Sequence, residues 1–183
     1  LTKELVNKHF NCVVHSYKDL PVLKSKTDYF TITRDDPRDI LLIKKKSLNK
    51  KKLIIGTSSP RRKSSVRDLK DLIGVKNLET KIIRGNVTSR LLKVISKNEY
   101  DAVFMAKAAI DRIFKYGNKV NKIDTKRFLI LFKKFKPFIL PLSIFPTAAS
   151  QGAIAIEYLK TDKKTKSILK NSDRENQCPQ PPP

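Results

Sequence analysis

The sequence predicts an α/β fold in which helices cover a parallel sheet. Short apolar runs of strand length alternate with longer segments whose apolar residues recur at helical spacing. Polar clusters follow the strands where the next helix begins, as they do at the carboxyl edge of open parallel sheets. Hydrophobic residues make up 39% of the 183 residues and charged ones 31%, which is typical of a globular chain with one or two cores.

The most informative stretch is IIGTSSPRR, residues 54–62. The apolar residues 53–55 predict a short buried strand. Ser58 or Ser59 is a suitable N-cap, and Pro60 suits the first helical position, where its missing N–H is not needed. The helix is expected to continue to residue 72, because apolar residues recur there at helical spacing.

Arg61 and Arg62 stand in the first turn of this predicted helix. A helix N-terminus offers free N–H groups and partial positive charge, and guanidinium groups bind carboxylates and phosphates. The stretch therefore indicates an anion site. A capped surface helix with two solvated arginines is the alternative.

The other elements follow from the same patterns. Residues 1–8 resemble a helix, and residues 44–52, rich in lysine, are the best linker candidate. Residues 118–146 have no assigned structure, and the tail from residue 171 is expected to be disordered. Strands are predicted at 11–15, 29–33, 40–43, 81–83, 100–105 and 153–158, and helices at 87–96 (with Asn86 as its cap), 106–114 and 161–170.

The formal net charge of +23 indicates an anionic partner: nucleic acid, an acidic membrane face or a polycarboxylate. Lysines outnumber arginines 30 to 10, but lysine runs are usually solvated, so the arginines are more informative. Five arginines lie near strand ends, where ligands of α/β sheets gather: Arg61, Arg62, Arg84, Arg90 and Arg112.

The two cysteines, Cys12 and Cys178, make neither a disulfide framework nor a metal cluster, which favours an intracellular setting. Cys12 is expected in the core, and His15 is expected to be packed rather than to act as a base. No signal peptide is recognised. Lysines and prolines interrupt the apolar segment 128–145, so we expect no membrane span and a soluble protein.

Six ordered motifs resemble the porphobilinogen deaminase (hydroxymethylbilane synthase) family. They cover most of residues 1–162, apart from the lysine-rich stretch and residues 118–146, which look longer than usual for the family. The motifs are VVHSYKDLP (13–21), TRDDPRD (33–39), IIGTSSPRR (54–62), IRGNVTSRLLK (83–93), DAVFMAKAAIDRI (101–113) and ASQGAIAIE (149–157).

The resemblance implies a two-lobed architecture like that of type II periplasmic binding proteins, with the active-site cleft between the lobes. Domain 1 would be incomplete, because the family's N-terminal strand precedes Leu1, and domain 3 would be absent. The implied division is 1–46 for partial domain 1, 47–52 for a linker, 53–145 for domain 2, 146–165 for the return to domain 1, and 166–183 for a non-matching, disordered tail.

The family is a transferase of tetrapyrrole and heme biosynthesis. It joins four porphobilinogen units into hydroxymethylbilane and releases ammonia. The chain grows on a dipyrromethane cofactor that a thioether attaches to a cysteine of domain 3. Cys178 lacks the surroundings of that cysteine, so no cofactor attachment is assigned here and the isolated chain is expected to be inactive or nearly so.

The resemblance also implies roles for individual residues. Asp19 matches the catalytic aspartate, although a lone aspartate in a turn is normally only a cap. The expected partners are porphobilinogen and the growing polypyrrole, bound by a monomer in cytoplasm or plastid, with no nucleic acid, membrane or metal. The carboxylate-binding residues would be Ser16, Lys18, Thr57, Ser58, Ser59, Arg61, Arg62, Arg84, Arg90 and Arg112.

Two other functions remain open at this point. A basic, non-enzymatic nucleic-acid-binding module would use the net charge of +23, but no known nucleic-acid motif is present and the arginines are not interleaved with aromatic residues. A solute-binding protein of the same lobed architecture would ordinarily carry a secretion signal, which is not recognised here.

Overall fold

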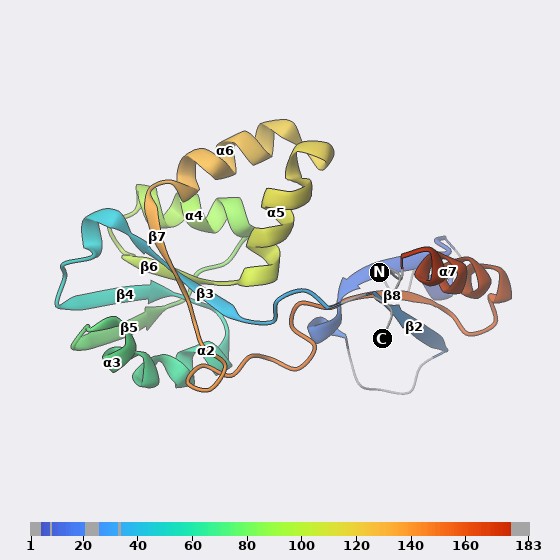
Figure 1. Ribbon diagram of the computed structural model, residues 1–183, viewed down its shortest axis with the longest axis horizontal. Helices are drawn as coiled ribbons and strands as arrows, with labels where there is room; N and C mark the ends of the chain where they lie inside the picture. Colours follow the sequence, from blue (N-terminus) through green and yellow to red (C-terminus); the bar gives the residue numbers. More distant parts are fainter. Residues whose placement is uncertain (1–4, 8, 21–25, 33, 177–183) are drawn as a thin grey trace, which may run out of the picture. The chain divides into compact units, whose positions relative to one another are not determined.

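The computed structural model describes residues 5–7, 9–20, 26–32 and 34–176, the last five of them by their backbone only (Figure 1). These residues form two compact units. Unit 1 combines the chain up to Asp35 with the chain from Ser150 onward, and unit 2 is the continuous segment Asp36–Ala149. The α/β class predicted from the sequence is confirmed.

Unit 1 is built on a small antiparallel sheet. Strand β8 (Ile154–Leu159) lies in the middle, between β1 (Cys12–Ser16) and β2 (Thr27–Thr31). A single 3₁₀ turn, Tyr17–Asp19, follows β1, and helix α7 (Lys163–Asn176) follows β8.

A buried carboxylate connects the three strands of unit 1. Glu157 on β8 is 1% exposed. It accepts a hydrogen bond of 2.7 Å from the Thr27 hydroxyl on β2 and lies 2.9 Å from His15 Nε2 on β1. His15 is therefore packed, as expected, whereas Cys12 is exposed and the expectation that it lies in the core is wrong.

Unit 2 contains a mixed five-stranded sheet. Its strand order is β5 (Asn77–Lys81), β4 (Lys52–Gly56), β6 (Ala102–Ala106), β3 (Asp39–Lys44) and β7 (Phe135–Ile139). Strand β4 runs parallel to β5 and β6, but β3 runs antiparallel to both β6 and β7. The predicted parallel arrangement is thus correct for β4, β5 and β6, whereas β3 runs against them and β7, antiparallel to β3, runs in the same direction as they do.

Helices lie on both faces of this sheet (Figure 1). The predicted helix after β4 is α2 (Pro60–Ser64), which continues as a 3₁₀ segment (Ser65–Leu69) and α3 (Lys70–Ile73). The region without an assigned structure contains α6 (Lys122–Phe132) and β7. The other helices are α4 (Val87–Ser96), capped by Asn86 as predicted, and α5 (Lys107–Val120).

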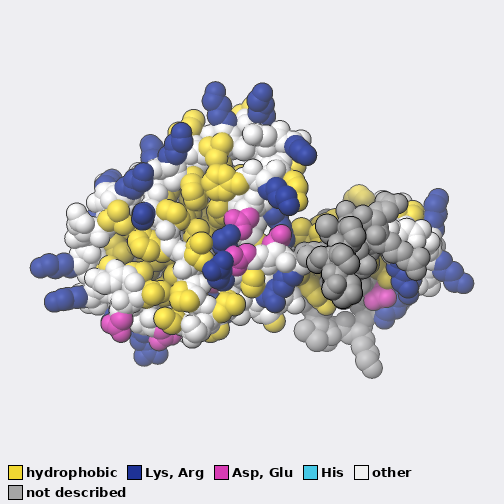
Figure 2. Space-filling model, viewed as in Figure 1, with side chains coloured by type: hydrophobic (Ala, Val, Ile, Leu, Met, Phe, Trp, Pro, Cys, Tyr) yellow, Lys and Arg dark blue, Asp and Glu magenta, His cyan; other side chains and the backbone are white. Residues whose placement is uncertain are grey.

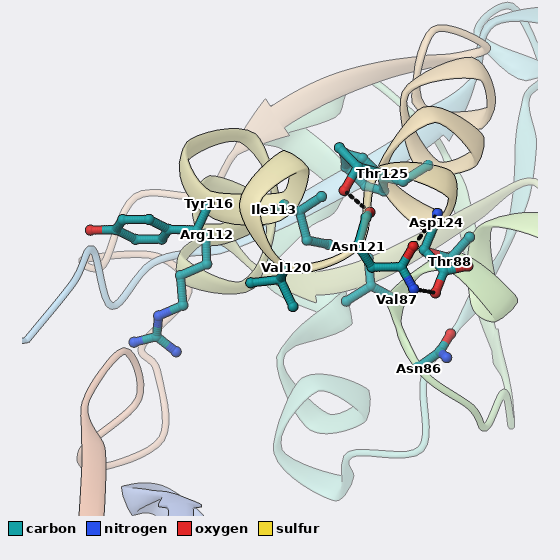
Figure 3. A pocket seen from close by; sticks show the side chains of 12 residues that line it. Asn86, Val87, Thr88, Arg112, Ile113, Tyr116, Val120, Asn121, Asp124 and Thr125 are labelled. Atoms are coloured by element: carbon teal, nitrogen blue, oxygen red, sulfur yellow. Dashed lines mark hydrogen bonds between the residues drawn. The ribbon is translucent and has the colours of Figure 1, made fainter.

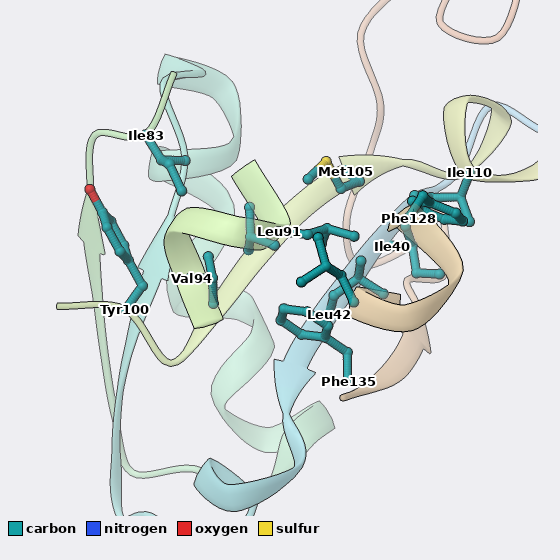
Figure 4. Close-up of a cluster of buried hydrophobic side chains, with 12 residues drawn as sticks. Ile40, Leu42, Ile83, Leu91, Val94, Tyr100, Met105, Ile110, Phe128 and Phe135 are labelled. Carbon is teal, nitrogen blue, oxygen red and sulfur yellow. The ribbon is translucent and has the colours of Figure 1, made fainter. Parts of the chain in front are cut away.

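The core of unit 2 consists of two hydrophobic clusters because β3 is buried on both faces. Ile40 and Leu42 pack in one cluster with residues of α4 and α6, such as Leu91 and Phe128 (Figure 4). Leu41 and Ile43, which alternate with them, belong to the other cluster. A strand covered on both sides reads as a continuous apolar run, which is why the sequence marks it clearly.

The boundary between the units differs from the expected one. Because β3 pairs with a strand on each side, the chain already belongs to unit 2 at Asp36 and not from residue 53. The expected linker, residues 47–52, is also part of unit 2: Ser47 is fully buried and Lys52 begins β4. The return to unit 1 comes at Ser150.

Two further expectations need correction. The strand expected at 81–83 ends at Lys81, because Ile83 leaves the sheet and packs against Gly56. A Cβ added to Gly56 would lie 2.8 Å from Cγ2 of Ile83. The tail expected to be disordered from residue 166 contains α7 as far as Asn176. Residues 177–183, with Cys178, and most of the predicted N-terminal helix lie outside the described residues.

Candidate functional site

The start of α2 presents two arginines on a tightly organised turn. The Ser59 side chain caps the helix and accepts the Arg62 N–H at 3.5 Å, and Pro60 is the first helical residue. The Thr57 hydroxyl accepts the Ser59 N–H at 3.2 Å and is buried, whereas Ser58 is exposed. These local hydrogen bonds fix the direction in which the two arginine side chains leave the helix.

Both arginines bind the same carboxylate. Arg61 Nη2 lies 2.6 Å from Asp39 Oδ2, and Arg62 Nη2 lies 2.7 Å from Asp39 Oδ1. Asp39, the first residue of β3, is fully buried, and Arg62 is only 7% exposed. Asp39 is not among the site residues predicted from the sequence, although its place between TRDDPR and a buried strand is a signal for it.

One carboxylate cannot neutralise both guanidinium groups, so positive charge and hydrogen-bond donors are left over at this site. The Nε atoms of Arg61 and Arg62 are buried and have no hydrogen-bond partner among the described residues. Burial and the charge of Arg62 lower the pKa of Arg90 on α4. The Arg90 guanidinium therefore lies within electrostatic range of Arg62. Unsatisfied buried donors beside uncompensated positive charge are the features of an anion-binding site.

Arg84 lies in the exposed turn between β5 and α4. The backbone there requires Gly85, which has φ 122° and whose added Cβ would lie 2.4 Å from Ser89 Oγ. Lys93 Nζ donates to the Arg84 carbonyl at 2.8 Å and holds the turn against α4. The Arg84 side chain makes no described contact with the Arg61–Arg62 pair.

Arg112 on α5 lines a separate cavity of about 390 Å³. Residues from the start of α4, from α5 and from α6 form its walls, including Asn86, Thr88 and Tyr116. In Figure 3 the Arg112 side chain extends away from α5 on the opposite side of the cavity from Asn86. The structure thus brings together Arg61, Arg62 and Arg90, and places Arg84 in the turn before α4 and Arg112 on α5.

Ser16, Lys18 and Asp19 lie together in unit 1, at the end of β1 and in the 3₁₀ turn that follows. All three are exposed. The Tyr17 N–H donates to the Ala153 carbonyl at 3.1 Å and ties this turn to the segment leading into β8. The turn therefore presents a carboxylate, an ammonium group and a hydroxyl on a fixed backbone.

The surface of unit 2 carries many lysine and arginine side chains, and a small group of acidic side chains lies among some of them (Figure 2). Within the described part of the chain, no helix is long and apolar enough to cross a membrane, and no group of three potential metal ligands occurs. No observation favours the nucleic-acid-binding alternative.

Comparisons with known proteins agree with the motifs. Residues 1–167 match the family model "Porphobilinogen deaminase, dipyromethane cofactor binding domain". A probable porphobilinogen deaminase of Picrophilus torridus is 34% identical over 174 residues, covering 93% of this chain and 52% of that protein. The porphobilinogen deaminase of Bacillus subtilis is 35% identical over 174 residues, covering 92% and 48%.

The chain therefore spans about half the length of the curated relatives it matches. Among solved structures, a probable amino-acid ABC transporter extracellular-binding protein from Bacillus subtilis aligns with a TM-score of 0.47 at 14% identity, over 96% of this chain and 68% of that chain. The family assignment rests on the family model and the relatives: this chain belongs to the porphobilinogen deaminase family.

Proposed function

We propose that this chain forms the pyrrole-binding part of a hydroxymethylbilane synthase, which joins porphobilinogen units and releases ammonia. The observation that carries the proposal is the pair of buried, unpartnered Nε atoms on Arg61 and Arg62 beside the charge of Arg90. Porphobilinogen carries two carboxylates on each ring, so a growing pyrrole chain is a polyanion that requires several such donors.

The residues present fit the dipyrromethane cofactor that the family model names. We propose that Arg61, Arg62 and Arg90 bind its carboxylates directly, because Arg61 and Arg62 have buried Nε donors without a partner and the charge of Arg62 acts on Arg90. When bound, this group supplies the pyrrole end to which new units are added. The supporting roles of Ser16, Lys18, Thr57, Ser58, Ser59, Arg84 and Arg112 are proposed from the family motifs.

Asp19 is the proposed catalytic carboxylate. Condensation of pyrroles places positive charge on a ring nitrogen, and a nearby carboxylate stabilises that charge and accepts the proton that is lost. The backbone hydrogen bond from Tyr17 to Ala153 holds the turn that carries Asp19. A carboxylate on a fixed turn can serve in the same way in each of several identical condensation steps. Asp19→Asn in the full-length enzyme should lower kcat far more than KM, and an unchanged kcat would remove Asp19 from this role.

Binding can be measured without turnover. Titration calorimetry of this chain with a synthetic dipyrromethane bearing acetate and propionate groups should give saturable binding. Arg90→Gln should weaken it at least tenfold, because one charge-assisted hydrogen bond contributes about 1.5–3 kcal/mol. Arg67→Gln, which removes an exposed arginine of unit 2, is the matched control. Equal losses in both variants would contradict the proposed carboxylate site.

The activity of this chain alone is a separate question. Because no cofactor attachment is assigned within it, incubation with porphobilinogen should yield little or no uroporphyrin after oxidation. Full turnover by the isolated chain would show that the remaining half of the curated relatives is dispensable.

A further inference from the structure

A cationic cavity lies at the other end of β3 from the arginine site. It has a volume of about 460 Å³ and is lined by Ile95 and five lysines: Lys44, Lys45, Lys46, Lys133 and Lys134. Asp39 and Lys44 are the first and last residues of β3, which places them about 17 Å apart at the usual rise of a strand. The two sites are therefore distinct.

Lys44 is unusual among these residues because it is only 2% exposed. Lysines are almost never buried without a partner. Among the described residues its ammonium group makes no hydrogen bond or ion pair. The acidic group whose charge acts on it is Asp101, and the oxygens of Asp101 already accept from Lys50 at 2.7 Å, Ser47 at 2.8 Å and the Ile54 N–H at 3.1 Å.

The surroundings of Lys44 lower the pKa of its ammonium group. Burial lowers its pKa, and the charges of Lys46 and Lys50 lower it further, against the attraction of Asp101. Both main effects oppose a charged ammonium at this position. A bound anion would relieve both, because it offers hydrogen-bond acceptors to the ammonium group of this largely buried residue and opposite charge to its neighbours.

The backbone holds the lysines of the cavity in place. Lys44 pairs with Phe135 in the β3–β7 ladder, and the Lys45 N–H donates to the Lys134 carbonyl at 3.0 Å. The turn after α6 is thereby fixed beside the 3₁₀ turn Lys45–Ser47. These lysines are part of a folded junction between four elements, unlike a lysine run on a solvated linker.

From this geometry we propose that the cavity at Lys44 is a binding site for a small, multiply charged phosphate-class anion. Its volume is in the range of small-ligand sites and does not suit a nucleic-acid duplex. Clustered ammonium groups act as point charges that suit phosphate oxygens, whereas planar carboxylates are better matched by arginine. This site does not depend on the proposed pyrrole-binding function.

The test uses inorganic pyrophosphate as the probe, with titration calorimetry of the 183-residue chain in 0.15 M NaCl. The wild-type chain should bind pyrophosphate saturably and gain thermal stability. Lys44→Met should weaken binding at least tenfold. Because a largely buried lysine is replaced by an apolar side chain of similar length, this variant should fold and should be at least as stable without the anion.

Two further variants make the result specific. Lys134→Gln removes an exposed lysine that lines the cavity, and it should weaken binding about threefold. Lys119→Gln removes the same charge from an exposed position on α5 and should leave the affinity unchanged. The proposal is overturned if pyrophosphate does not bind at this salt concentration, if Lys44→Met binds like wild type, or if Lys119→Gln weakens binding as much as Lys44→Met.

Discussion

At the scale of single residues, Asp39 is the buried carboxylate that links β3 to α2 in unit 2. It lies fully buried between Arg61 and Arg62, so it leaves one of the two positive charges uncompensated. The same contact therefore has two consequences. It stabilises the fold by pairing β3 with α2, and it keeps guanidinium donors in place for an anionic ligand.

Asp39→Asn should destabilise unit 2 by about 3 kcal/mol, because it leaves the buried guanidinium of Arg62 and the half-buried guanidinium of Arg61 without a counter-charge. Urea unfolding monitored by circular dichroism measures this loss. Asp71→Asn, at an exposed position of the same unit, is the control and should change stability by less than about 0.5 kcal/mol. Similar effects of the two substitutions would show that the buried pair is unimportant for stability.

Ser150 carries backbone strain at the junction between the units. Its φ of 58° lies in the left-handed region, where residues other than glycine are disfavoured by about 1–2 kcal/mol. Ser150→Gly should therefore raise the thermal midpoint by a few degrees. Ser96→Gly, at an exposed position of α4, should lower it slightly. A lower midpoint for Ser150→Gly would mean that the hydroxyl contributes more than the strain costs.

Asp36 predicts a pH dependence of stability. Hydrogen bonding from the Arg38 side chain, against the opposing effect of burial, lowers the pKa of Asp36 from 3.8 to about 2. A carboxyl group with a lowered folded-state pKa stabilises the protein above its unfolded pKa and loses that effect as pH falls through the folded value.

Asp36→Asn should accordingly be less stable than wild type at pH 7, and the difference should disappear between about pH 4 and pH 2. Urea midpoints at pH 7, 4 and 2 test this. Asp68→Asn, which removes an exposed carboxylate of the same unit, is the control. A difference that persists undiminished at pH 2 would contradict the ion pair with Arg38.

At the scale of elements, the caps determine where helices begin beside the site. The Asn86 side chain accepts the Ser89 N–H at 2.8 Å and starts α4, the helix that carries Arg90. Asn86→Ala should cost about 1 kcal/mol and increase hydrogen exchange at the Ser89 amide, whereas Asn86→Gly should cost only a few tenths. Equal losses for both variants would show that the side-chain cap is not what stabilises the helix start.

The sequence predicts those elements that depend on local chemistry. The N-cap, predicted as Ser58 or Ser59 and found at Ser59, acts within four residues, as do Pro60 at the first helical position and Asn86 before α4, so their signals are visible in the chain. The positions of Arg61 and Arg62 follow directly from the first of these signals.

Elements that depend on distant partners could not be predicted in this way. The antiparallel direction of β3 is set by β6 and β7, more than fifty residues later, and the partnership of Asp39 with two arginines crosses more than twenty residues. Ile83 is predicted to belong to a strand because it is apolar, but it is buried against Gly56 and does not pair with another strand. Lysines dispersed among the apolar residues of α6 and β7 concealed both elements.

At the scale of the whole molecule, the two units differ in how the chain builds them. Unit 2 is one continuous segment with hydrophobic clusters on both faces of its sheet. Unit 1 combines two segments separated by all of unit 2, and its central strand β8 comes from the second segment. Its sheet cannot form until both segments are present.

The fragment 36–149 should therefore fold by itself, because every strand partner of its five-stranded sheet lies within it. We expect a cooperative thermal transition and dispersed amide resonances for this fragment. The fragment 1–35 should remain unfolded, since β1 and β2 pair only with β8 among the described strands. A non-cooperative transition of 36–149 that becomes cooperative only in the full chain would show that unit 2 depends on unit 1 for its stability, despite its continuous core.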